Sequence, residues 1–165
     1  ERDRRICLQS REFVQMMRLC WERKMLPVNE FVNELASLGR EKQKSFLMHC
    51  IRMLRENFVR NFGIEKIVYM TEREKTFSTR FSPYVHEGNI IPLFDEFERA
   101  YSDIIRNGNG KIIFTDLCIK VMQNIRPWKT WKTKRYKLKI EQLKPKNKYH
   151  IIFNFQFSIN TIWAR

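Results

Sequence analysis

Residues 112–125 constrain the fold most strongly, because they form a helical pattern that is apolar on nearly every side. The segment follows the glycine-rich stretch 107–110. Its apolar positions are Ile112, Ile113, Phe114, Leu117, Cys118, Ile119, Val121, Met122 and Ile125. A narrow polar stripe remains at Asp116, Lys120 and Gln123. Such a helix needs apolar neighbours around it, so we predict that it is the most buried helix of a helical bundle.

Five further segments have apolar residues at helical spacing. Each segment is flanked by residues that typically start or end helices. They cover about residues 10–24, 29–38, 40–62, 71–82 and 89–105. The clearest start is the capping box Thr71–Glu74, in which each side chain can bond the other residue's backbone N–H. Pro27 is expected to end the first helix, and Asn29 to cap the second. Because the connections are short, we predict an all-α bundle of about five to six helices with largely antiparallel neighbours.

The helix expected over residues 40–62 is both apolar and strongly basic. Leu47, Ile51, Leu54 and Phe58 repeat on one stripe and should face the core. Outside the stripe, Arg52, Glu56 and Arg60 are expected to form an i, i+4 ladder of ion pairs. The helix also bears the cations Arg40, Lys42, Lys44, Arg52 and Arg55. These cations either form a solvated face or contact a partner protein, and the sequence leaves both interpretations open.

Charge divides the chain into two parts near Arg126 and Pro127. The net charge of the 165 residues is +14. Residues 127–165 account for +9 of it, with ten lysines and arginines and a single acid, Glu141. We therefore predict a helical domain over residues 1–126 and a basic tail over residues 127–165.

Two interpretations of the basic tail stay open. In the first, it is an arm that contacts nucleic acid phosphates, with tryptophans and a tyrosine for base stacking. The contact residues would then be Lys129, Lys132, Lys134, Arg135 and Lys137, interleaved with Trp128, Trp131 and Tyr136. In the second, which we favour, it is a frameshifted or read-through end without a selected fold. The alternation of Phe153, Phe155 and Phe157 fits a short β-strand, and disorder is the other expectation.

No group of residues typical of a catalytic, nucleotide or metal site stands out. The stretch Asn107–Ile112 is nearest to a phosphate loop, but a Walker A motif needs Gly at position 105 and Ser or Thr at 112, and both residues are Ile. The cysteines form no C-x-x-C pair and the histidines are scattered, which favours free thiols in a reducing cytosol over a zinc site. No apolar run is long enough to span a bilayer. We predict a cytoplasmic protein that is not an enzyme, with no cofactor, small-molecule substrate or membrane contact.

Several segments of the helical part occur in an order that is found in one protein family. They are RLCWERK (18–24), GREKQKSFL (39–47), RMLRENF (52–58), RFSPYV (80–85) and NGNGKIIF (107–114). Together they resemble the C-terminal part of bacterial DNA polymerase III delta-prime subunits, and the resemblance covers about residues 5–126. The family implies a clamp-loader subunit in which an AAA+ module is followed by a helical collar. The resemblance is to the collar, so the AAA+ module is expected before Glu1.

The resemblance implies a non-catalytic oligomerisation domain that holds a clamp loader together while the sliding clamp is placed on DNA. Its partners would be the delta and gamma/tau subunits, and DNA would be reached only through the assembly. The five cations of residues 40–62 are the candidate interface, and the apolar residues Phe46, Met48 and Met53 beyond the stripe favour such contacts. An alternative of a different class is a free-standing basic helical protein that binds nucleic acid through residues 127–165. Removal of the tail should leave subunit association intact in the first case and abolish function in the second.

Overall fold

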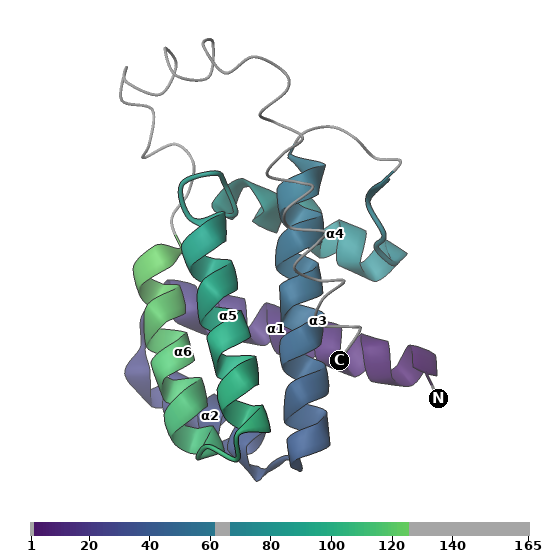
Figure 1. The fold of residues 1–165 in the computed structure, drawn as a ribbon. Helices are drawn as coiled ribbons and strands as arrows, with labels where there is room; N and C mark the ends of the chain where they lie inside the picture. The colour runs from purple at the N-terminus through teal and green to yellow at the C-terminus, as the bar shows by residue number, and fades with distance from the viewer. Residues whose placement is uncertain (1, 62–66, 126–165) are drawn as a thin grey trace. The chain divides into compact units, whose positions relative to one another are not determined.

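The computed structural model of the protein describes residues 2–61 and 67–125, and these residues form an all-α bundle (Figure 1). The helices are α1 (Arg2–Glu22), α2 (Met25–Ser37), α3 (Arg40–Arg60), α4 (Glu72–Phe81), α5 (Ile90–Ile105) and α6 (Gly110–Asn124), and the short 3-10 helix η2 (Ser82–Tyr84) follows α4. All of them belong to one compact unit, Glu1–Arg126. The predicted helical bundle is thereby confirmed. The basic tail and its expected strand lie outside the described residues, so the boundary at residue 126 stays a prediction.

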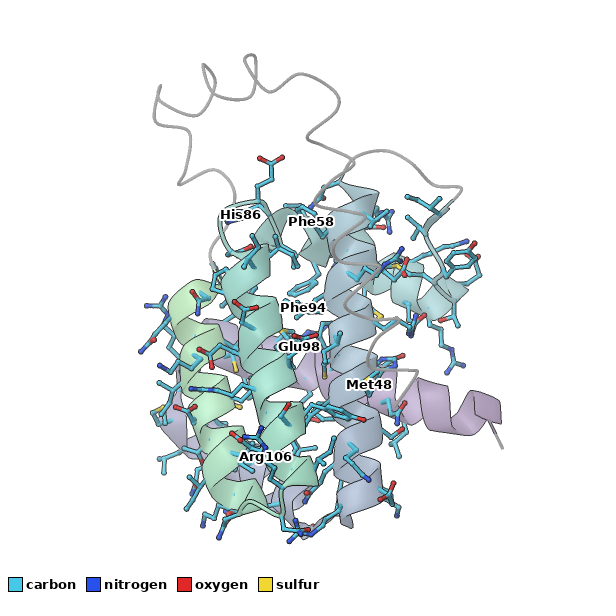
Figure 2. The ribbon with its side chains drawn as sticks, in the orientation of Figure 1. Met48, Phe58, His86, Phe94, Glu98 and Arg106 are labelled. Atoms are coloured by element: carbon cyan, nitrogen blue, oxygen red, sulfur yellow. The ribbon has the colours of Figure 1, made fainter. Side chains whose placement is uncertain are left out.

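Helix α3 is the most buried helix of the described bundle. It packs most extensively against α5 and is crossed by α1 (Figure 1). Twelve of its 21 residues are buried. Phe58 of α3 and Phe94 of α5 are among the buried side chains that fill the space between these two helices (Figure 2).

The prediction that residues 112–125 form the most buried helix is wrong. Helix α6 contacts α1, α2 and α5 on its inner side, but no described helix covers its outer side (Figure 1). Only five of its 15 residues are buried. Ile112 is 68% exposed and Ile119 is 36% exposed. The apolar pattern of α6 therefore exceeds what its own bundle covers.

Helix α3 can be central although it is rich in polar residues, because its buried polar side chains have partners. The side-chain amide of Gln43 donates to the carbonyl oxygens of Leu35 and Leu38 at the end of α2, at 3.2 and 2.8 Å. Asn57 accepts a hydrogen bond from the Ser78 hydroxyl of α4 at 2.7 Å. A buried polar group with a hydrogen-bond partner avoids most of its desolvation cost. The polar residues of α3 thus connect it to its neighbours.

Most helix boundaries follow the local signals, with one exception. The capping box is confirmed, since the Thr71 hydroxyl accepts from the Glu74 N–H and the Glu74 carboxylate accepts from the Thr71 N–H. The exception is the junction of the first two helices, where both expectations are wrong. Pro27 does not end the first helix, because α1 already ends at Glu22, and Asn29 does not cap the second, because α2 already begins at Met25. Pro27 then lies in the first turn of α2, where its missing N–H costs no helical hydrogen bond. Asn109 caps α6 by accepting from the first backbone N–H groups of that helix.

Candidate functional site

A buried polar network joins α1, α3 and α4. The Ser10 hydroxyl donates to Glu74 Oε1 at 3.0 Å and lies 3.3 Å from His49 Nε2. Arg52 forms an ion pair with Glu74 Oε1, and its Nη2 lies 3.4 Å from His49 Nδ1. His49 is 6% exposed and Glu74 is 2% exposed. The sequence analysis missed this group, because Ser10 is 39 positions from His49 and 64 from Glu74.

The network contains a serine, a histidine and a carboxylate, but its hydrogen bonds do not run as in a serine hydrolase. The Arg52 guanidinium can only donate, so His49 Nδ1 accepts and Nε2 carries the proton. The Ser10 oxygen then accepts from Nε2–H, while its own proton is donated to Glu74. A nucleophilic serine needs the reverse, with a histidine nitrogen that takes its proton and a carboxylate on the other ring nitrogen. The geometry fits a structural network that ties three helices together.

A second polar contact fixes the segment that precedes α4. Glu56 Oε2 accepts from the Tyr69 backbone N–H at 2.8 Å, and Arg52 Nη1 donates to the Tyr69 carbonyl oxygen at 3.0 Å. Glu56 is buried and also pairs with Arg55 at 2.5 Å. The predicted ladder of Arg52, Glu56 and Arg60 is therefore wrong. These side chains reach across to the segment 69–79, because α4 and the residues before it pack beside this part of α3.

The five cations proposed as a partner interface all have intramolecular neighbours. Arg52 and Arg55 pair with Glu74 and Glu56, Lys44 pairs with Glu41, Lys42 lies near Glu12, and Arg40 donates to the carbonyl oxygens of Ile104 and Asn107. Burial raises the pKa of the Glu12 carboxyl, and the charge of Lys42 offsets part of that rise. Contacts within the chain therefore account for the basic side of α3. Contact of these residues with a partner stays a prediction, and the candidate nucleic-acid residues 129–137 lie outside the described residues.

The thiols of Cys20, Cys50 and Cys118 are free and buried, as the sequence predicted for its cysteines. A hydrogen bond with Cys118 and burial raise the pKa of the Cys20 thiol, and burial raises that of Cys50. Protonated thiols are poor nucleophiles and poor metal ligands. Within residues 2–61 and 67–125, no group of three or more metal-binding side chains is present.

An apolar stripe runs along the outer side of α6, and we name Ile105, Ile112 and Ile119 the isoleucine stripe. Ile112 and Ile119 are seven residues apart, which places them two turns apart on the same side of the helix. Ile105 is exposed at the end of α5, just before the turn into α6. Their side chains remain in contact with solvent, since no other described helix covers them. Ile112 and Ile119 are thus exposed, although the apolar pattern of their segment predicts that they are buried.

Comparison of the chain with models of protein families, with curated proteins and with solved structures found no match. None of the described helices is long and apolar enough to cross a membrane.

The free energy of unfolding is expected to fall by about 2 kcal/mol when the pH drops from about 7 to about 5. Burial and the neighbouring Arg52 lower the pKa of His49 to about 4. In the unfolded chain this pKa is about 6.5, so between the two values only the unfolded state binds the extra proton. His49 therefore contributes its full stability above about pH 6.5, and the contribution is lost as the pH falls towards 4.

Denaturant titrations of the protein and of its His49→Gln variant at both pH values test this expectation. Glutamine has no titrating group. The free energy of unfolding of the variant should therefore change less with pH, by the amount that His49 contributes. Equal pH dependence in the two proteins would show that His49 does not titrate as its buried position indicates.

Proposed function

We propose that residues 1–126 are a non-catalytic assembly domain of the clamp-loader collar type, in the bacterial cytoplasm. The domain would hold the delta and gamma/tau subunits together while the sliding clamp is loaded. The resemblance to delta-prime subunits names these partners, and the all-α bundle is compatible with a collar. The observation that supports an assembly role is the isoleucine stripe.

In this proposal the isoleucine stripe is the partner interface, instead of the residues that the sequence suggested for partner contact. Phe46 and Met53 are buried within the bundle, so its own core accounts for them, while Met48 is half-buried. Single exposed apolar residues are ordinary on protein surfaces, but here two isoleucines are exposed on the same side of one helix, and a third is exposed at the end of the preceding helix. Protein interfaces have such apolar centres with polar rims, and Lys111 and Lys120 of α6 would belong to the rim. Burial against a neighbouring helix would complete the apolar surroundings that α6 lacks in the isolated chain.

Co-purification of the full chain with delta and gamma/tau subunits tests the proposal. We expect a complex that survives gel filtration at a salt concentration high enough to screen the +14 charge of the chain. A genuine delta-prime subunit serves as the positive control. If that control assembles and this chain does not, the proposed function is wrong.

We expect no saturable ATP binding by this chain. The Asn109 side chain accepts from the N–H groups of Lys111 and Ile112 at 3.0 and 3.3 Å, so the first amides of α6 are already capped. A phosphate loop needs such amides free for the nucleotide. Isothermal titration with ATP is the measurement, and Lys111→Ala is the matched variant. Saturable binding that the variant abolishes would contradict the expectation.

A further inference from the structure

A groove between α1 and α4 has a basic rim and an apolar floor, and we name it the arginine groove. Its cavity has a volume of about 510 Å³. Arg18 of α1 and Arg73 and Arg80 of α4 form the rim, while Met17 and Phe81 are among the buried side chains of the floor. The residues around the groove include neither Ile112 nor Ile119, so it is separate from the isoleucine stripe.

Three arginines line the arginine groove. Among the residues that the structure describes, those that line this cavity include no acid. Arg18 and Arg80 are exposed, and neither forms an ion pair with any other residue that the structure describes. Guanidinium groups bind carboxylates through two parallel hydrogen bonds. The groove is thus complementary to an anionic ligand that also has an apolar part.

The neighbouring cavity along the same two helices limits how far a polyanion could extend. It adjoins the arginine groove at Arg18, Arg73 and Phe77, but its lining also contains Glu22, Glu72 and Glu74. A strand of nucleic acid that continued along α1 and α4 would bring its phosphates next to these carboxylates. The positive region is therefore local, and it fits a short ligand.

The aromatic rings in the groove are engaged with one another. Phe81 stacks on Phe77 at a centroid distance of 4.9 Å and on Tyr84 at 6.3 Å. Trp21 meets Tyr84 edge-on at 4.9 Å and is 44% exposed. Binding of single-stranded nucleic acid relies on free ring faces for its bases. Rings that already stack on each other offer mainly an apolar wall, which suits an aliphatic or aromatic side chain of a peptide.

We propose that the arginine groove binds an acidic peptide segment of a partner protein. One apolar or aromatic side chain of the peptide enters the cavity beside Phe77, and flanking carboxylates bind Arg18 and Arg80. The volume of the cavity suits such an anchor, because ligand sites of this kind span about 300–1,000 Å³. The site would add a peptide contact that is distinct from helix-to-helix assembly.

A fluorescent peptide of aspartates and glutamates around one phenylalanine is the probe, and the full chain is the binding partner. We expect saturable binding that weakens about tenfold in Arg18→Gln and in Arg80→Gln, since each loses a charge-assisted hydrogen bond. Arg106→Gln is the matched control, because it removes the same charge at the end of α5, away from α4 (Figure 2). A peptide with serine in place of phenylalanine should also bind about tenfold more weakly.

The control variant distinguishes specific binding in the groove from attraction by the net charge of the chain. The distinction is needed because a chain with a net charge of +14 attracts acidic peptides in every variant. Equal weakening by Arg106→Gln, or equal affinity for the serine peptide, would show that only net charge is involved and would overturn the proposal. Competition with single-stranded DNA is the second measurement. If DNA binds more tightly than the peptide and is equally sensitive to Arg18→Gln and Arg80→Gln, the ligand is nucleic acid and the peptide proposal is wrong.

Discussion

Replacing Glu74 by alanine is expected to lower the free energy of unfolding by about 2–4 kcal/mol. The substitution removes the carboxylate that accepts from Arg52, from the Ser10 hydroxyl and from the Thr71 N–H. It leaves the Arg52 charge partly buried without its partner, and it opens the capping box of α4. Because the Arg52 side chain is still partly exposed, the loss should be smaller than for a fully buried pair.

Glu72→Ala is the matched control for this prediction. Glu72 lies in the same turn of α4, but its side chain is exposed and pairs with the partly exposed Lys75. Exposed pairs of this kind contribute less than about 1 kcal/mol. Urea titrations of both variants measure the difference. Similar losses in Glu72→Ala and Glu74→Ala would mean that the buried network does not hold α4 against α1 and α3.

Replacing Leu117 by alanine is expected to lower the free energy of unfolding by about 2–5 kcal/mol. Leu117 is 1% exposed and lies on the inner side of α6. Ile112→Ala provides the comparison within the same helix, and there we expect a loss below about 1 kcal/mol. A large loss at both positions would place α6 inside the bundle, as its sequence pattern predicted. A loss below about 0.5 kcal/mol at Leu117 would instead show that α6 is not packed against the bundle.

Local signals predicted the helices well, because they depend on neighbouring residues. The capping box needs only Thr71 and Glu74, and it begins α4 as expected. The break at Gly108 is equally local, since a Cβ there would lie 2.7 Å from a side-chain atom of Ile113 and 2.9 Å from the Asp103 carbonyl oxygen. Asn29 does not cap a helix, because proline is also common in a first turn and Pro27 occupies the first turn of α2.

Burial could not be read from apolar content alone. Helix α6 is more apolar than α3 by its sequence, yet α3 is the central helix. The polar residues of α3 are buried because partners from other helices reach them. Leu35 of α2 lies 8 positions from Gln43, and Ser78 of α4 lies 21 positions from Asn57. The periodicity of one segment does not reveal such partners. An apolar surface such as that of α6 can also be covered by another chain, so its pattern does not identify the core of one domain.

The polar network and the arginine groove were beyond sequence reasoning for the same reason. Ser10, His49 and Glu74 belong to three helices, and nothing in their spacing indicates that they meet. The groove likewise combines residues of α1 with residues of α4. One signal was present, because the capping box fixed Glu74 at a helix start with its carboxylate turned inward. The basic residues of the tail, which the sequence singled out for nucleic acid, lie outside the described residues.

The isoleucine stripe is the proposed assembly surface, and the affinity of the full chain for delta and gamma/tau subunits tests this role most directly. The variant carries Ile112→Ser together with Ile119→Ser, and Gln123→Ser at an exposed position of the same helix is the control. Removal of two apolar side chains from an interface should weaken assembly at least about tenfold, while the control assembles as the unmodified chain does. Thermal unfolding should be nearly unchanged in both variants, because these side chains are not part of the core. Undiminished assembly by the double variant would contradict the claim that α6 joins this domain to its partners.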